Sequence, residues 1–201
     1  MTFAQLERET IVERVTDNYY FRANNGYWAG GYAPYGYNIK HIIGHDGKRH
    51  SILEENKEQS KIVKRIYDMY INKNMSMRKI AQQLNHDKIP TLKKGLWGVN
   101  AISSILSRPI YTPATAKIYN YYLNLGTNIT NTVENFDGGL TANLYGKAKK
   151  NVKVKARRNY DEMYLSLINC TAIISNEDWF KAQKIKGTAT YLPPRTNTSK
   201  I

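Results

Sequence analysis

The sequence predicts an α+β protein that is mainly α-helical, with a small β-hairpin and strand component. Apolar residues recur at helical spacing in several segments, and strand-prone residues flank a Gly-rich turn at 44–47. Of the 201 residues, 41% are hydrophobic and 23% are charged, which is typical of globular proteins. A chain of this length can bury a substantial core, so we expect one or two domains.

The first element is an amphipathic helix over residues 3–20, whose apolar positions recur every three to five residues. It has no clear N-cap, so we expect the chain to begin inside a longer helix. Four Gly and a Pro in 24–39 exclude helix and predict a turn-rich lead into a strand. Residues 37–43 and 49–53 are strand-prone on either side of the 44–47 turn, which predicts a hairpin.

Three shorter helices follow in the central part of the chain. One is expected from Glu58 to about Ile71, and Ser76 is expected to cap a second that ends before Pro90. A third is predicted over 98–107, with its apolar face formed by Val99, Ile102, Ile105 and Leu106. Pro109 ends it, because proline cannot continue a helix.

Residues 113–158 have weak periodicity and many Asn, Thr, Gly and Tyr residues. We expect irregular strands there, together with a mobile loop that contains the basic run 146–158. The segment 164–185 predicts a strand and then a helix that begins at Ser175 or Asn176. The tail from Gly187 is typical of a linker.

The net charge of +14 is concentrated in two segments. Residues 57–94 hold ten basic and three acidic side chains, and residues 147–158 hold seven basic and no acidic ones. Each segment therefore contributes +7, and the remainder is neutral. Clustered cations favour a phosphate polymer as partner, because binding releases condensed counterions. Solvated lysine-rich faces and a membrane surface remain alternatives.

Several protein classes are excluded by the composition. No apolar run reaches the ~18 to 20 residues that span a bilayer, and the first ten residues are too charged for a signal peptide. The single cysteine, Cys170, excludes an internal disulfide and a Cys-rich zinc finger. A reducing cytoplasm is the expected environment.

The helices of 76–84 and 98–107 suit a helix-turn-helix, whose second helix lies in the major groove. The outer face of the second helix carries candidates to meet base edges or phosphates, which are Asn100, Ser103, Ser104 and Ser107. The connector of about a dozen residues is longer than the usual three or four, so an ordinary helix pair is the alternative.

Other candidate sites have ordinary explanations beside them. His41, His45 and His50 could converge on a metal with Asp46 only across the hairpin, and solvated turn histidines are commoner. The 16 tyrosines could stack on bases, but rings that fill a small core are the simpler reading. No catalytic motif is present, and Cys170 is expected to be a small buried side chain.

Five blocks, taken in order, resemble the large serine recombinases. The first resembles the end of the long helix that leaves the catalytic domain, and the others resemble successive blocks of the recombinase domain. Trp97 lies between the third and fourth blocks. The blocks are FAQLERETIVERV (3–15), WAGGYAPYGY (28–37), IVKRIYDMYINKNMSMRKIAQQLNHDKIPT (62–91), AISSILSRPIY (101–111) and AIISNEDWFKAQ (172–183).

The resemblance implies site-specific DNA recombination of the kind carried by phages and mobile elements. Residues 1–22 would end the connecting helix, 23–186 would form the recombinase domain with an irregular basic insertion at about 113–158, and 187–201 would be a linker. The catalytic serine would precede residue 1, so this chain should be inactive alone. It would need no cofactor, and zinc would bind only in a ribbon beyond Ile201.

The implied partner is a double-stranded DNA attachment site, with self-association of the full-length parent as a dimer or tetramer and no membrane. The expected location is the bacterial cytoplasm, at the nucleoid. Two rivals remain: a stand-alone helix-turn-helix transcriptional regulator, and a module whose basic loop binds an acidic protein.

Within this reading, residues 22–37 would follow the minor groove and the helix of 98–107 would enter the major groove. The expected DNA-binding residues are Arg22, Tyr35, Arg78, Lys79, Lys93, Lys94, Asn100, Ser103, Ser104, Arg108, Lys149, Lys150, Lys153, Lys155, Arg157 and Arg158.

Overall fold

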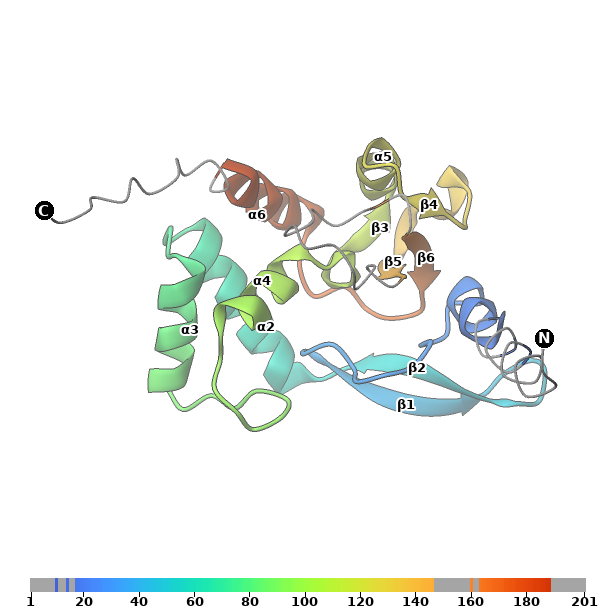
Figure 1. Ribbon diagram of the computed structural model, residues 1–201, viewed down its shortest axis with the longest axis horizontal. Coiled ribbons are helices and arrows are strands. Elements are labelled where there is room, and N and C mark those ends of the chain that lie inside the picture. The colour runs from blue at the N-terminus through green and yellow to red at the C-terminus, as the bar shows by residue number, and fades with distance from the viewer. Residues whose placement is uncertain (1–9, 11–13, 15–16, 147–159, 161–162, 189–201) are drawn as a thin grey trace, which may run out of the picture.

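The computed structural model describes residues 10, 14, 17–146, 160 and 163–188. Figure 1 shows a mixed α+β protein with helices at one end, a four-stranded sheet at the other and a long hairpin beneath them. Residues 10, 14 and 17–24 are helical, as expected for part of 3–20. No helix among the described residues is long and apolar enough to cross a membrane.

The predicted hairpin is confirmed as strands β1 (Tyr37–Ile43) and β2 (Arg49–Glu55), which pair antiparallel. Gly47 has φ +69°, a left-handed conformation that glycine adopts without a steric penalty and that the tight turn requires. The backbone N–H of Trp28 donates to the carbonyl of Ser51 over 2.7 Å. The Gly-rich lead is therefore fastened to the hairpin.

The three central helices begin and end close to the predicted residues. They are α2 (Lys57–Ile71), α3 (Met77–His86) and α4 (Val99–Ser107). Side chains cap the first two, since Asn56 accepts from the N–H of Gln59 and Ser76 accepts from the N–H of Lys79. The expected apolar face of α4 is wrong at its first residue, because Val99 is 42% exposed.

The sheet at the other end has the strand order β3-β5-β6-β4. Its strands are β3 (Pro113–Thr115), β4 (Asn128–Ile129), β5 (Asp137–Tyr145) and β6 (Tyr164–Ile168). Strands β3 and β6 pair antiparallel with β5, whereas β4 pairs parallel with β6. Short 3₁₀ turns, η1 (Pro109–Tyr111) and η2 (Val133–Asn135), precede β3 and β5.

Helix α5 (Ala116–Asn124) lies in the stretch for which the sequence predicted only irregular strands and a loop. Asparagine and tyrosine have modest helix propensity, and they make up five of its nine residues. Only Ile118 and Tyr122 are buried, so the apolar periodicity is short. The helix owes its stability to packing that a local pattern does not reveal.

The two ends share one hydrophobic core. Helix α6 (Asn176–Thr188) crosses from one to the other, and its Trp179 is fully buried. The hydroxyl of Tyr37 lies 3.1 Å from the carbonyl oxygen of Ile110 and 2.8 Å from that of Thr171. Cys170 is buried, as expected. Hairpin, helices and sheet are therefore joined in one body.

Candidate nucleic-acid interface

The connector, residues 87–98, is closed against the end of α3 by one side chain. The Asn85 amide donates to the carbonyl of Trp97 over 3.0 Å and accepts from the N–H of Trp97 over 2.7 Å. The indole N–H of Trp97 donates to the carbonyl of Ile89 over 2.9 Å. An asparagine amide that satisfies both backbone groups of one residue fixes that residue in place. The long connector is thus an ordered structure.

The tip of the connector is a small turn built around Thr91. Its hydroxyl lies 3.0 Å from the N–H of Gly95 and 3.1 Å from the carbonyl oxygen of the same residue. The N–H of Lys94 donates to the Thr91 carbonyl over 3.0 Å. Lys93 and Lys94 are exposed at the tip, and the Lys93 ammonium lies 5.0 Å from the centre of the Tyr32 ring, within reach of a cation–π contact.

Ion pairs account for every acidic residue in the first basic segment, 57–94. Glu58 pairs with Lys61 over 2.9 Å, Asp68 pairs with Lys73 over 3.4 Å, and Asp87 pairs with Arg65. Hydrogen bonding from Arg65, and then from His86, holds the pKa of the Asp87 carboxyl below its usual value. Subtracting three pairs from ten basic residues leaves seven basic side chains.

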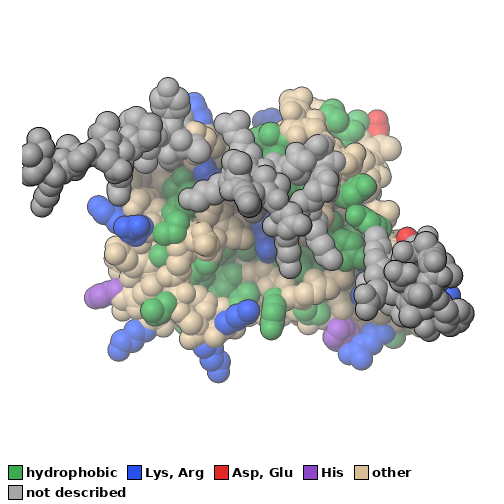
Figure 2. Space-filling view, in the orientation of Figure 1, with side chains coloured by type: hydrophobic (Ala, Val, Ile, Leu, Met, Phe, Trp, Pro, Cys, Tyr) green, Lys and Arg blue, Asp and Glu red, His purple; other side chains and the backbone are tan. Residues whose placement is uncertain are grey.

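These seven form no ion pair with an acidic residue in the described part of the chain. Figure 2 shows Lys and Arg side chains along the lower left edge of the molecule, over α3 and the connector. Five of the seven lie on α3 and the connector, and the other two lie on α2. The seven residues are Lys57, Lys64, Arg78, Lys79, Lys88, Lys93 and Lys94.

Helix α4 begins directly after the connector. Its N-cap, Gly98, offers no side-chain hydrogen bond, so the first backbone N–H groups and the positive end of the helix dipole lack a side-chain cap. Asn100 is exposed, and Ser103 and Ser104 are half-buried. The hydroxyl of Ser107 already donates to the Ser103 carbonyl over 2.6 Å.

A hollow of about 460 Å³ lies between the 32–35 segment, the connector and α4. It brings together four of the predicted DNA-binding residues, which are Tyr35, Lys93, Ser104 and Arg108. The Tyr35 side chain is buried, its hydroxyl donates to the Pro90 carbonyl over 3.3 Å, and its ring packs edge-on against Trp97. The observed contacts of Tyr35 thus support the connector.

The other predicted residues are more widely spread. Arg78 and Lys79 are exposed at the start of α3, and Arg22 is exposed near the end of the N-terminal helix. Contact of these residues with DNA stays a prediction. Lys149, Lys150, Lys153, Lys155, Arg157 and Arg158 lie outside the described residues.

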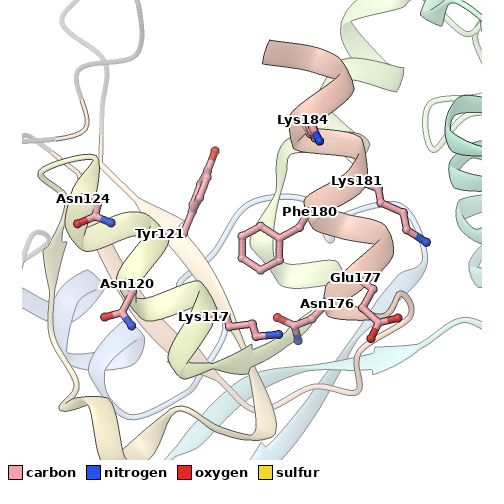
Figure 3. A pocket seen from close by; sticks show the side chains of 9 residues that line it. All are labelled: Lys117, Asn120, Tyr121, Asn124, Asn176, Glu177, Phe180, Lys181 and Lys184. Atoms are coloured by element: carbon pink, nitrogen blue, oxygen red, sulfur yellow. The ribbon is translucent and has the colours of Figure 1, made fainter. Parts of the chain in front are cut away.

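A larger hollow of about 700 Å³ lies between α5 and α6 (Figure 3). Lys117 extends from α5 toward Asn176, and Phe180 points from α6 toward α5. The Asn176 amide is committed to the Thr115 hydroxyl over 2.9 Å and to the Pro113 carbonyl over 3.0 Å. None of the residues predicted from the sequence lines this hollow.

Of the hairpin histidines, only His50 is buried, and His41 and His45 are exposed. The imidazole of His50 is buried, lies 2.9 Å from one carboxylate oxygen of Asp46 and stacks on the Tyr27 ring at 4.0 Å. Within the described residues, no three His, Cys, Asp or Glu side chains are grouped in a way that could hold a metal.

Three residues that shape the candidate interface, Asn85, Trp97 and Tyr32, are not among the expected DNA-binding residues. Asn85 and Trp97 lie twelve positions apart, which no helical or strand period indicates. Tyr32 is 77% exposed and lies against Lys93, and its position directly after Gly30 and Gly31 was the only available signal.

Two solved structures are similar to this chain over most of its length. A chain from a crystal structure of an LSR–DNA complex matches with a TM-score of 0.47 and 16% identity, over 94% of this chain and 43% of that one. A second, from work on the sequence requirements of the Listeria innocua prophage attP site, matches with a TM-score of 0.46 and 16% identity, over 92% and 56%. This chain therefore spans about half the length of these relatives.

The family assignment rests on the sequence rather than on these structures. The model of the recombinase family matches residues 57–188, which is about two thirds of the chain. The matched region includes α2, α3, the connector, α4, the sheet and α6. The chain therefore belongs to the recombinase family.

Proposed function

We propose that this chain binds duplex DNA as the recombinase domain of a large serine recombinase. The observation that carries the proposal is the connector, which is held by the two hydrogen bonds between the Asn85 amide and the Trp97 backbone, here called the Asn85–Trp97 lock. The connector exposes Lys93 and Lys94 shortly before the N-terminus of α4, which has no side-chain cap. This feature lies inside the segment that matches the recombinase family. Uncompensated cations next to an uncapped helix start suit a phosphate backbone.

The proposed division of labour follows from exposure and charge. Helix α4 enters the major groove, where Asn100 and Ser104 meet base edges, because an asparagine amide can pair with adenine. Lys93 and Lys94 contact phosphates on one side, and Arg78 and Lys79 extend that contact along α3. The segment 22–37 follows the minor groove. Phosphate contacts set the register, and base contacts set the sequence.

In the full-length parent, a serine in another domain attacks a phosphodiester, and subunits assemble for strand exchange at an attachment site. This chain binds the DNA and does not cleave it. Incubation of the purified chain with supercoiled plasmid should leave the plasmid uncut at every protein concentration. Nicked product formed by the chain alone would contradict this assignment.

The binding surface is tested by removing the two connector charges. Lys93→Ala/Lys94→Ala should weaken binding to every duplex sequence alike, and the slope of log affinity against log salt should fall by about 1 for each phosphate that is no longer neutralised. Fluorescence anisotropy over a KCl series measures both. Lys117→Ala/Lys181→Ala removes the same charge from α5 and α6 and should leave the slope unchanged.

The reading of bases is tested separately at Asn100. Asn100→Ala should reduce the ratio of affinities for a duplex selected by this chain and a scrambled duplex, while the salt slope stays as it is. An equal loss of affinity for both duplexes would show that Asn100 does not read sequence.

A further inference from the structure

Apolar side chains are exposed around the connector and the start of α4. Leu96 is 84% exposed, Tyr32 77%, Leu92 45% and Val99 42%. Tyr32, Leu92 and Leu96 line the same hollow, and Val99 follows Leu96 by three residues. Several exposed apolar groups gathered beside one hollow indicate a surface that another molecule covers.

Leu96 is held outward by its neighbours on both sides. Trp97 is only 5% exposed and is fastened by the two bonds to Asn85 and by its indole N–H. On the other side, the N–H and carbonyl of Gly95 are bound to the Thr91 hydroxyl. Leu96 therefore cannot turn inward unless these bonds break. An apolar group fixed in advance binds without paying the entropy of ordering it.

The surroundings of Leu96 indicate what covers it. Lys93 and Lys94 precede it in the same turn, exposed and without an ion-pair partner among the described residues, and Asn100 follows it on the exposed side of α4. A molecule that matches this surface carries negative charge along its edge, a hydrogen-bonding base edge and small apolar groups between them. Duplex DNA presents all three in the major groove, where the apolar group is the C5-methyl of thymine.

We propose that Leu96 and Val99 contact thymine methyl groups beside the base that meets Asn100. This inference rests on the proposed function of the connector and α4, and it assigns a sequence preference to two residues that make no hydrogen bond through their side chains. Selectivity arises because each thymine methyl is moved from water into contact with an apolar side chain.

The experiment uses deoxyuridine, which lacks only the C5-methyl of thymidine. A duplex is first selected by this chain from a random-sequence library, and a copy is made with deoxyuridine at every thymidine. The unmodified chain should bind the thymine duplex about fourfold more tightly for each methyl group that it touches. Leu96→Ala should bring the ratio of the two affinities toward 1. Leu123→Ala, which shortens a leucine that is 51% exposed on α5, should keep the full ratio.

The outcomes separate this inference from the proposed function. If the unmodified chain selects and binds no duplex at all, both fail. If it binds a selected duplex but Leu96→Ala retains the full thymine preference, the inference alone is overturned. If Leu96→Ala instead changes the sedimentation of the DNA-free protein while that preference persists, the surface is a protein contact, and the inference is again overturned.

Discussion

The helical end and the sheet end share one core but differ in the charge of their described residues. Residues 57–94 carry ten basic and three acidic side chains, whereas the described residues between 113 and 174 carry only Lys117, Glu134 and Asp137. Helix α6, which follows the sheet, fixes the end of α4, because the Trp179 indole N–H donates to the Arg108 carbonyl over 3.1 Å. Among the described residues, the excess positive charge therefore lies at the helical end, where the proposed DNA contacts also lie.

The largest expected effect on stability comes from breaking the Asn85–Trp97 lock at the helical end. Trp97→Ala removes a buried ring and the hydrogen bond from its indole N–H, and should lower the free energy of unfolding by about 3–5 kcal/mol in urea denaturation. Trp97→Phe keeps most of the ring and should cost less. A connector that needs no lock would leave both the stability and the DNA affinity of Trp97→Ala unchanged.

A smaller effect is expected where the hairpin meets both ends. Gly36 has φ +103°, and a Cβ there would lie 2.9 Å from Cδ1 of Ile173 and 3.3 Å from Cγ2 of Val63. Gly36→Ala should cost about 2–3 kcal/mol in thermal or urea unfolding, from backbone strain and overlap together. Gly47→Ala also has a positive φ but open space, so it should cost only about 1 kcal/mol. Equal losses would show that the junction is not tightly packed.

A still smaller effect, that of one hydrogen bond, is expected at the N-cap of α3. Ser76→Ala removes the acceptor for the Lys79 N–H and should lower the free energy of unfolding by about 1 kcal/mol. Ser76→Asp retains an acceptor at the helix start and should preserve stability. If Ser76→Asp is destabilised as much as Ser76→Ala, the cap is not what the serine supplies.

The smallest effect is the pH dependence at Asp87. Its pKa is lowered in the folded state from an ordinary value of 3.8 by the hydrogen bond from Arg65. The stabilisation is therefore complete above the unfolded pKa, and it is lost as the pH falls through 3.8 toward the folded pKa. Urea unfolding of the unmodified chain and Asp87→Asn between pH 6 and pH 3 should show the difference in stability narrowing. In an Arg65→Ala background, the loss of stability caused by Asp87→Asn should change less with pH. An equal change with pH in both backgrounds would exclude Arg65 as the cause of the pH dependence.

Prediction from sequence succeeded where the signals are local. The helical period, the Ser76 cap and the stop at Pro109 placed α2, α3 and α4 within one or two residues. The hairpin followed from its Gly-bounded turn. The fold class is confirmed as mixed α+β, whereas a helix-turn-helix is not established by the packing of α3 and α4.

Elsewhere the determinants are distant in the sequence. The pairing of Thr141 with Ile168 and the cohesion of α5 depend on partners that no local pattern names. Of the expected DNA-binding residues, Tyr35, Lys93, Ser104 and Arg108 line one hollow, and their contact with DNA stays a prediction. The Asn85–Trp97 lock was not predicted, because a hydrogen bond between a side-chain amide and the backbone across a loop produces no periodic pattern in the sequence.

The attachment of α6 to α4 has a mechanical consequence. The Gln183 amide donates to the Leu106 carbonyl, and the Lys186 ammonium contacts the Ser107 hydroxyl, next to the bond from Trp179. Together these contacts attach the last turn of α4 to α6. A rotation of α6 must therefore either carry α4 with it or break three hydrogen bonds. We expect the two helices to move as one rigid unit.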